Sequence, residues 1–238
     1  MVSTSIVIFS LLFAPLFAQS NPPLTSEQRA DILMARKMYR EAADVYKEGP
    51  LDSAIILNKI GIAYHQMLRL DEAKKYYEKA IKANPKYSEA VNNLGTIYYS
   101  KKSFRKATSQ YNKALKLNPN SASVYSNLGT AQFARKKYKE ASESYQKALS
   151  LDPEVFEHRN SYGTLLLERS VAEKAKFHYY LAKTYASAGH VERAIQYIRM
   201  ALEEGFKERN KLMEEPEFAK LRETAEFQAL MALEPRVV

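Results

Sequence analysis

The stretch VNNLGTIYYSKKSFRKATSQYNKALKLNP, Val91 to Pro119, decides the fold. Its apolar residues recur at helical spacing in two runs of about 13 residues, separated by the polar linker SKKSF. This pattern predicts two antiparallel helices. Gly95 stands inside the first run, although glycine is about 1 kcal/mol less favourable than alanine within a helix. The reason for that glycine therefore has to come from packing.

The same pattern occurs three times along the chain. The stretch LNKIGIAYHQMLRLDEAKKYYEKAIKANP ends at Pro85 and YSNLGTAQFARKKYKEASESYQKALSLDP ends at Pro153, so the three prolines are 34 residues apart. Four more columns align at this period: Gly61, Gly95 and Gly129; Ala73, Ala107 and Ala141; Tyr77, Tyr111 and Tyr145; Ala80, Ala114 and Ala148. Such self-similarity is the signature of a repeat architecture.

Small residues in the glycine column and the first alanine column predict a close approach of the two helices within each unit. The unfavourable backbone entropy of glycine is then offset by packing that a larger side chain would forbid. The Asn-Pro or Asp-Pro pair at the end of each unit stops the second helix, because proline disfavours the helical conformation in the residue before it.

These columns resemble the tetratricopeptide repeat (TPR) family, whose W-x2-L-G-x2-Y…A-x3-F…P pattern is matched with leucine in place of tryptophan. The matching residues in the unit that ends at Pro85 are Leu57, Ile60, Gly61, Tyr64, Ala73, Tyr77 and Ala80. The next unit matches with Val91, Leu94, Gly95, Tyr98, Ala107, Tyr111 and Ala114. In the third unit, Gln132 stands where tyrosine is expected. The resemblance implies an all-α, TPR-type right-handed solenoid of antiparallel helix pairs.

Weaker matches extend the resemblance to about Ser26 to Gly205. Upstream, Ala30, Ala42 and Tyr46 occupy repeat columns, with about three residues missing before Ala54. After Gly205, two short amphipathic turns predict capping helices that cover the last apolar face, as a solenoid requires; their apolar residues are Phe218, Leu221, Phe227 and Leu230. This tail resembles those of exported bacterial members of the family.

The expected organisation has seven parts. They are a signal peptide (1–18), a degenerate first unit (19–53), three units (54–87, 88–121 and 122–155), degenerate overlapping units (156–205) and a C-terminal cap (206–238). In the overlapping units, a helix from about Ala172 to Ser187 closes one pair and opens the next.

The apolar run from Ile6 to Ala18 is typical of a secretory signal peptide. It is shorter than the roughly 20 residues that span a bilayer, and Pro15 interrupts it. We therefore expect an exported protein, periplasmic or secreted, that is cleaved near Ala18, with a membrane-anchored form as the alternative. The chain contains no cysteine, which excludes disulfides and thiolate metal sites.

The sequence contains none of the common nucleotide-binding, hydrolase, zinc-protease or calcium-loop motifs. Its histidines, at 65, 158, 178 and 190, are scattered over different units without a ligand spacing. We therefore expect no catalytic site, no metal and no cofactor, and the chain is predicted not to be an enzyme.

The resemblance implies that the first helix of each pair lines a concave groove for a peptide or a partner helix. The repeat register places an amide and hydroxyl lining with aromatic patches on that face. These groove residues are Asn58, Lys59, Ile62, Asn92, Asn93, Thr96, Tyr99, Ser126, Asn127, Thr130, Phe133, Asn160, Ser161 and Thr164. Such side chains could bond to a partner's backbone, or be merely common repeat residues. On the first interpretation, Asn93 and Asn127 contribute to binding and little to stability.

A carboxylate clamp, by which some family members bind a terminal carboxylate, needs basic residues at particular groove positions. Ser123 and Asn127 occupy two of them, which argues against a clamp here.

The linkers between paired helices carry positive charge in register with the repeat. We call their basic residues the basic ridge: Lys101, Lys102, Arg105, Lys106, Arg135, Lys136, Lys137 and Lys139. Arg36, Lys37 and Arg40 extend it if the first unit keeps register. The net charge of the chain is +9. The ridge either favours solubility or binds an acidic partner or an anionic envelope surface.

The predicted function is a non-enzymatic protein–protein interaction scaffold that binds a peptide or protein segment in the concave groove. Binding of an anionic polymer or membrane surface through the basic ridge is the alternative. Because the secretory signal predicts export, nucleic acid is not the anionic polymer that we expect the basic ridge to bind. The sequence does not identify the partner.

Overall fold

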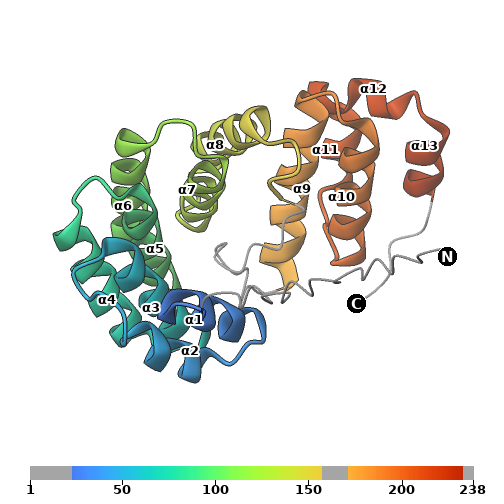
Figure 1. The fold of residues 1–238 in the computed structure, drawn as a ribbon. Helices are drawn as coiled ribbons and strands as arrows, with labels where there is room; N and C mark the ends of the chain where they lie inside the picture. Colours follow the sequence, from blue (N-terminus) through green and yellow to red (C-terminus); the bar gives the residue numbers. More distant parts are fainter. Residues whose placement is uncertain (1–22, 157–170, 233–238) are drawn as a thin grey trace, which may run out of the picture.

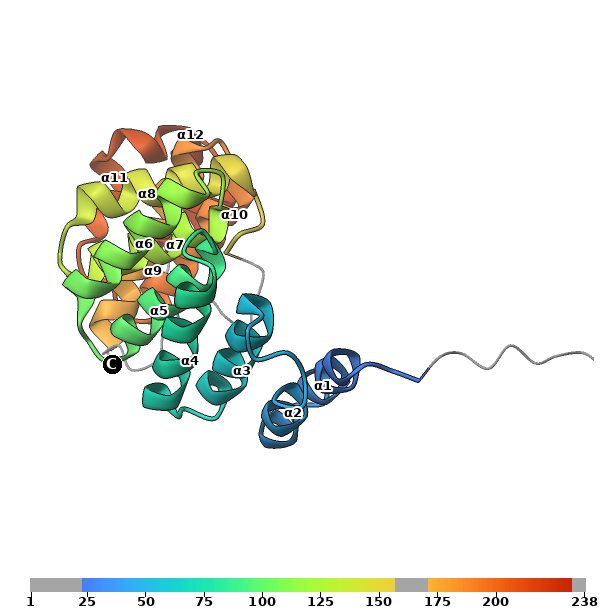
Figure 2. The same ribbon diagram turned by 60° about the vertical axis from the view of Figure 1, so that its left-hand side comes forward.

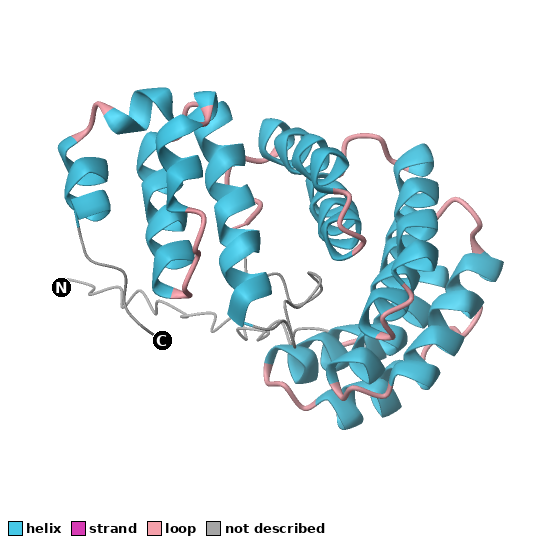
Figure 3. Ribbon diagram, turned by 180° about the vertical axis from the view of Figure 1, so that it is seen from behind, coloured by secondary structure: helices cyan, strands magenta, loops and turns pink. Residues whose placement is uncertain are grey.

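The computed structural model describes residues 23–156 and 171–232. The helices and their bounds are α1 (Ser26–Ala35), α2 (Tyr39–Tyr46), α3 (Ala54–Gln66), α4 (Leu70–Ala83), α5 (Ser88–Ser100), α6 (Phe104–Leu117), α7 (Ala122–Ala134), α8 (Tyr138–Leu151), α9 (Val171–Ser187), α10 (Val191–Glu203), α11 (Arg209–Glu214), the 3-10 helix η1 (Pro216–Phe218), α12 (Ala219–Arg222) and α13 (Ala225–Ala232). These ranges contain no strand (Figure 3).

Consecutive helices pack as pairs, and the pairs stack along an arc (Figure 1). The fold class predicted from the sequence, an all-α right-handed solenoid with short C-terminal capping helices, is confirmed. The first helices of the pairs, α3, α5 and α7, lie on the inner side of the arc, and α4, α6 and α8 lie outside them (Figure 1). We call the surface formed by α1, α3, α5 and α7 the inner face. The first pair, α1 and α2, lies at one end of the stack (Figure 2).

Local sequence signals set the helix ends. Asn84, Asn118 and Asp152 are extended, each directly before a proline, and each ends the second helix of a unit. The side-chain oxygen of each also accepts a hydrogen bond from the backbone amide two residues later, at 3.0, 3.3 and 2.9 Å. These turns start the next unit.

The glycine column lies where the two helices of a pair touch. A Cβ atom placed on Gly95 would lie 2.6 Å from Cε1 of Tyr111, and the same atom on Gly61 or Gly129 would lie 2.6 or 2.5 Å from Tyr77 or Tyr145. These tyrosine rings are fully buried. The close approach predicted from the sequence is therefore present, with a tyrosine ring over each glycine.

The helix α9 packs against the third unit on one side and against α10 on the other. Phe177 and Tyr180 contact Phe133 edge to face, and Tyr180 stacks on Tyr138. The pairing of α9 with α10 is as extensive as that within a unit. The helix expected from Ala172 to Ser187 is thus observed, with α10 as its partner.

The short C-terminal helices cover the end of the solenoid. Phe206 stacks on Tyr179 with ring centroids 4.5 Å apart. Phe218, Leu221, Phe227 and Leu230, the apolar residues of the predicted cap, are buried in the same core cluster. Lys183 pairs with Glu215 and, at 3.3 Å, with Glu217, and the hydroxyl of Tyr179 donates to Glu215. Burial opposes the charge of Lys183, but the two carboxylates outweigh it and raise its pKa.

Within the described ranges, no helix is both long and apolar enough to cross a bilayer. The predicted signal peptide, residues 1–18, lies outside the described residues.

We predict that Gly95→Ala destabilises the protein by about 1 to 3 kcal/mol, because the new methyl group overlaps the buried ring of Tyr111. This result would reverse the gain of about 1 kcal/mol that alanine normally brings to a helix interior. Urea unfolding measures the change. Ser109→Ala, at an exposed position of α6, is the matched control and should leave the midpoint nearly unchanged. A Gly95→Ala protein as stable as wild type would contradict the contact.

Candidate functional site

A pocket of about 560 Å³ opens at the first two junctions between helix pairs. It is lined by Asp31, Met34, Ala35, Lys37, Tyr39, Tyr46, Ile55, Asn58, Lys59, Ile62, Gln66, Tyr87 and Glu89. Most of these residues come from α1 and α3, and Tyr87 and Glu89 come from the start of α5. Ile55 is 52% exposed although it is a large apolar residue. The volume is within the range of small-ligand clefts.

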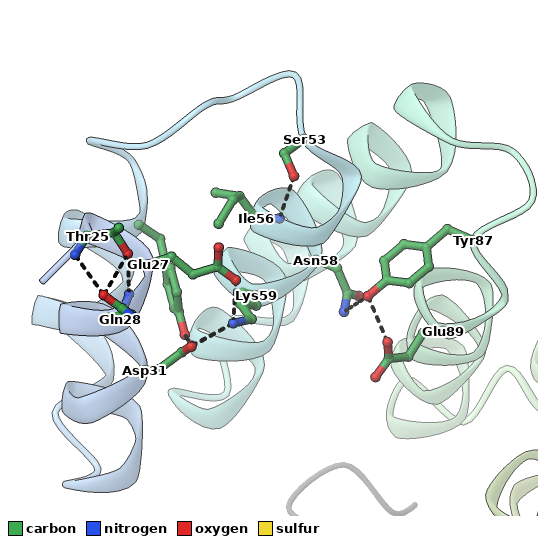
Figure 4. A network of polar contacts seen from close by, with 11 residues as sticks. Thr25, Glu27, Gln28, Asp31, Ser53, Ile56, Asn58, Lys59, Tyr87 and Glu89 are labelled. Carbon is green, nitrogen blue, oxygen red and sulfur yellow. Dashed lines mark hydrogen bonds and ion pairs between the residues drawn. The ribbon is translucent and has the colours of Figure 1, made fainter.

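Ion pairs hold the α1 side of the pocket. The ammonium of Lys59 lies 2.8 Å from carboxylate oxygens of both Glu27 and Asp31 (Figure 4). The hydroxyl of Tyr46 also donates to Asp31. Burial lowers the pKa of Lys59, but its hydrogen bonds and charge interactions with Asp31 and Glu27 outweigh that effect, so the pKa is raised. Lys59 is therefore charged and already has two anionic partners.

Hydrogen bonds fix the α5 side of the pocket. Tyr87 donates to Oε2 of Glu89 at 2.7 Å and accepts from Nδ2 of Asn58 at 3.5 Å (Figure 4). Burial, and then the hydrogen bond to Glu89, raises the pKa of Tyr87. The phenol therefore stays neutral and acts as a donor to the carboxylate.

Four asparagines of the predicted groove bond to one another across three helix pairs. We call Asn58, Asn92, Asn93 and Asn127 the amide ladder. Nδ2 of Asn93 donates to Oδ1 of Asn58 at 3.0 Å, and Nδ2 of Asn127 donates to Oδ1 of Asn92 at 3.1 Å. Nδ2 of Asn92 donates to Oδ1 of Asn93 at 3.4 Å, which joins the two contacts. All four side chains are buried.

The amide ladder corrects one expectation from the sequence. Asn93 and Asn127 were expected to contribute little to stability, but both lie in the core and carry hydrogen bonds between neighbouring units. A buried amide that loses its partner destabilises the protein by about 1 to 3 kcal/mol. Asparagine in these columns is therefore a structural residue.

The remaining groove residues fall into distinct environments. Asn58, Lys59 and Ile62 line the pocket. Thr96 and Thr130 are buried beneath Tyr111 and Tyr145, whose hydroxyls donate to them at 3.3 Å. Tyr99 and Phe133 are buried, and Ser126 is half-buried. Asn160, Ser161 and Thr164 lie outside the described residues.

Sequence reasoning did not place several lining residues in the groove, namely Asp31, Met34, Ile55, Gln66, Tyr87 and Glu89, and it assigned Lys37 to an extension of the basic ridge. A signal for two of them was present: Ile55 and Glu89 are 34 residues apart and occupy one repeat column. Ile55 also precedes Lys59 by four residues, which places both on one side of α3. Asp31 comes from α1 and Tyr87 from the start of α5, and only the stacking of the helix pairs brings them to the pocket.

The basic ridge is partly neutralised by the protein itself. Lys101 pairs with Asp71 of the preceding unit, and Lys137 pairs with Glu140 at 2.7 Å. Lys106 lies 5.7 Å from the ring centroid of Tyr98. Lys102 and Lys136 occupy the left-handed position of the turn between paired helices, with φ of 56° and 61°. Lys102, Arg105, Lys136 and Lys139 are exposed, and Arg135 is half-buried.

Sequence profiles of the tetratricopeptide repeat match residues 54–87 and 122–155, and a second such profile matches residues 76–108. A TPR repeat profile matches residues 95–135. No curated protein matches the sequence of this chain.

Solved structures of MamA are similar in fold. One is 20% identical, covers 76% of this chain and 96% of its own, and superposes with a TM-score of 0.51. MamA from Desulfovibrio magneticus RS-1, residue 41 to the end, is 20% identical, covers 75% and 92%, and also has a TM-score of 0.51. The first TPR of Spaghetti (RPAP3), solved with the HSP90 peptide SRMEEVD, is 33% identical over 48% of this chain and 90% of its own, with a TM-score of 0.44.

We predict that Asn93→Ala destabilises the protein by about 2 kcal/mol, because it leaves the Oδ1 of Asn58 and the Nδ2 of Asn92 without their partner. Thermal or urea unfolding measures the loss. Asn112→Ala replaces an exposed asparagine on α6 and serves as the control. If the two variants unfold at the same midpoint, the amide ladder does not hold the units together.

Proposed function

Because the chain belongs to the tetratricopeptide repeat family, we propose that it is a non-enzymatic interaction scaffold that binds a peptide or protein segment on its inner face. The pocket of about 560 Å³ between α1, α3 and the start of α5 carries this proposal. Proteins built from such repeats generally act through protein or peptide partners and not through catalysis.

The chemistry of the pocket supports a peptide ligand. Exposed Ile55 offers apolar surface, and exposed Glu89 offers a carboxylate in the same lining. A bound segment would bury its side chains against the apolar residues and satisfy its backbone groups at the polar ones. Burial of a few anchoring side chains in a pocket supplies most of the affinity in such interfaces.

The first experiment tests whether this pocket binds peptides. We predict that linear peptides selected from a random phage-displayed library on the wild-type chain lose at least tenfold in affinity for Ile55→Asp, or about 1.4 kcal/mol. The substitution puts a charge in place of an exposed apolar side chain of the pocket lining. Because Ile55 is exposed and lies in the first turn of α3, an acidic residue there is compatible with the helix.

Met213→Asp is the matched control, since Met213 is also about half exposed but lies on α11, at the opposite end of the chain. It should bind the selected peptides as wild type does. Equal loss in both variants, or no loss in Ile55→Asp, would place peptide binding elsewhere and overturn the proposal.

A second candidate function is the binding of an acidic partner or an anionic envelope surface by the basic ridge. Its support is the exposure of Lys102 and Lys136 at the same turn position of successive units. This candidate predicts retention on anionic phosphatidylglycerol vesicles at low salt, which falls as salt screens the charges. Retention should fall further for Lys102→Gln with Lys136→Gln, while Lys113→Gln with Lys147→Gln, on exposed positions of α6 and α8, serves as the control. If the vesicles do not retain the wild-type protein at low salt, the basic ridge does not bind an anionic surface and this candidate function is wrong.

We also propose that the scaffold acts outside the cytoplasm, on the strength of the apolar run from Ile6 to Ala18. The intact mass of exported protein tests this. A mature form that begins near Gln19 fits a cleaved signal, and a mass that retains residues 1–18 fits a membrane-anchored form.

A further inference from the structure

The hydrogen bonds of the amide ladder and the pocket form one directional chain. Donors run from Asn127 to Asn92, from Asn92 to Asn93, from Asn93 to Asn58, from Asn58 to Tyr87 and from Tyr87 to Glu89. Each step uses an N–H or O–H of one residue and an oxygen of the next. Hydrogen bonds in such a chain polarise one another in the same sense.

This chain of hydrogen bonds ends at the carboxylate of Glu89, in the pocket lining. Glu89 is exposed and lines the pocket, and Oε2 accepts the last hydrogen bond at 2.7 Å. The donors of this hydrogen-bond chain all point toward the carboxylate, and the neutral, half-buried Tyr87 holds it in place. An ionised carboxylate has more acceptor sites than one donor fills. Glu89 is therefore a positioned acceptor for a ligand.

Two carboxylates, Asp31 and Glu89, and two lysines, Lys37 and Lys59, line the pocket. Lys59 is bound by both Glu27 and Asp31. Lys37 is exposed, in the turn after α1. Asp31 is therefore already paired with a lysine, whereas Glu89 is exposed and accepts its hydrogen bond from the neutral Tyr87.

Apolar surface lies beside the acceptor. Ile55 and Glu89 occupy the same repeat column on neighbouring first helices, and both line the pocket together with Met34 and Ile62. A lysine or arginine side chain combines an aliphatic stem with a cationic head. It can therefore cover the exposed isoleucine and reach the carboxylate at once.

We propose that this pocket recognises a basic side chain, lysine or arginine, of an extended peptide segment, with its stem on Ile55 and its cationic head at Glu89. The proposal rests on the proposed function and deepens it by naming the chemistry of the partner. Glu89 is the binding residue, and Tyr87 is a positioning residue that orients its carboxylate. An acidic peptide group at the same place is disfavoured, because the carboxylate of Glu89 repels it.

The test uses three libraries of acetylated and amidated nonapeptides, identical except for one fixed central residue: arginine, glutamine or glutamate. Binding of each library to the full chain is measured by fluorescence anisotropy. The arginine library is expected to bind about fivefold more tightly than the glutamine library, the scale of one ion pair at a partly exposed site. The glutamate library should bind weakest. The arginine preference should shrink as salt is added.

Variants connect this preference to the named residues. Glu89→Gln should bind the arginine and glutamine libraries equally while it keeps wild-type affinity for the glutamine library. Tyr87→Phe keeps the ring but removes the hydroxyl, and should lower the arginine preference without affecting binding of the glutamine library. Glu143→Gln, which removes an exposed carboxylate from α8, is the matched control and should keep the full preference.

The outcomes distinguish a failure of this inference from a failure of the proposed peptide-binding function on which it rests. Peptides that bind wild type but show no arginine preference, or a preference that survives Glu89→Gln, overturn the inference and leave the peptide-binding scaffold standing. A tighter glutamate library would likewise overturn it in favour of an acidic partner. If all three libraries bind wild type and Ile55→Asp alike, peptide binding does not use the pocket, and both proposals fail.

Discussion

The contact between a glycine and a tyrosine ring inside the three central helix pairs, α3–α4, α5–α6 and α7–α8, is the constraint on which the structure depends. Gly61, Gly95 and Gly129 have no Cβ, and that absence admits a fully buried ring from the second helix. This contact therefore sets the distance between the axes of the two helices, and a residue larger than glycine would increase that distance. The same geometry repeated every 34 residues gives an arc in which the first helices form one continuous inner face.

Stacking of the units depends on a second, polar contact. At the two middle junctions a side-chain amide donates to the amide oxygen 35 residues earlier, from Asn93 to Asn58 and from Asn127 to Asn92. At the first junction the equivalent contact joins Lys59 to Glu27, 32 residues earlier, because the first unit is about three residues shorter. An ion pair thus replaces the amide pair where the first unit joins the array. The pocket extends from this junction to the next one.

The amide ladder also connects stability with recognition. Its hydrogen bonds hold neighbouring first helices together, and its last donor, Asn58, bonds to Tyr87, which in turn orients the carboxylate of Glu89. A group positioned by buried partners loses less conformational entropy on binding than a free surface side chain. Binding residues on the inner face therefore depend on the repeat stack behind them.

The sequence by itself determined the repeat, the helix pairs and their ends. Gly95, Tyr111 and Asn118-Pro119 act within one unit, so their period and local chemistry specify the pair before any neighbour is known. Only the tertiary structure decided what the polar inner residues do. An asparagine side chain can bond a partner or a neighbour equally well, and stacking brought Asn58 to Asn93 and Asn92 to Asn127. It also left Ile55 and Glu89 exposed in one pocket lining, because burial depends on which surfaces the neighbouring units cover.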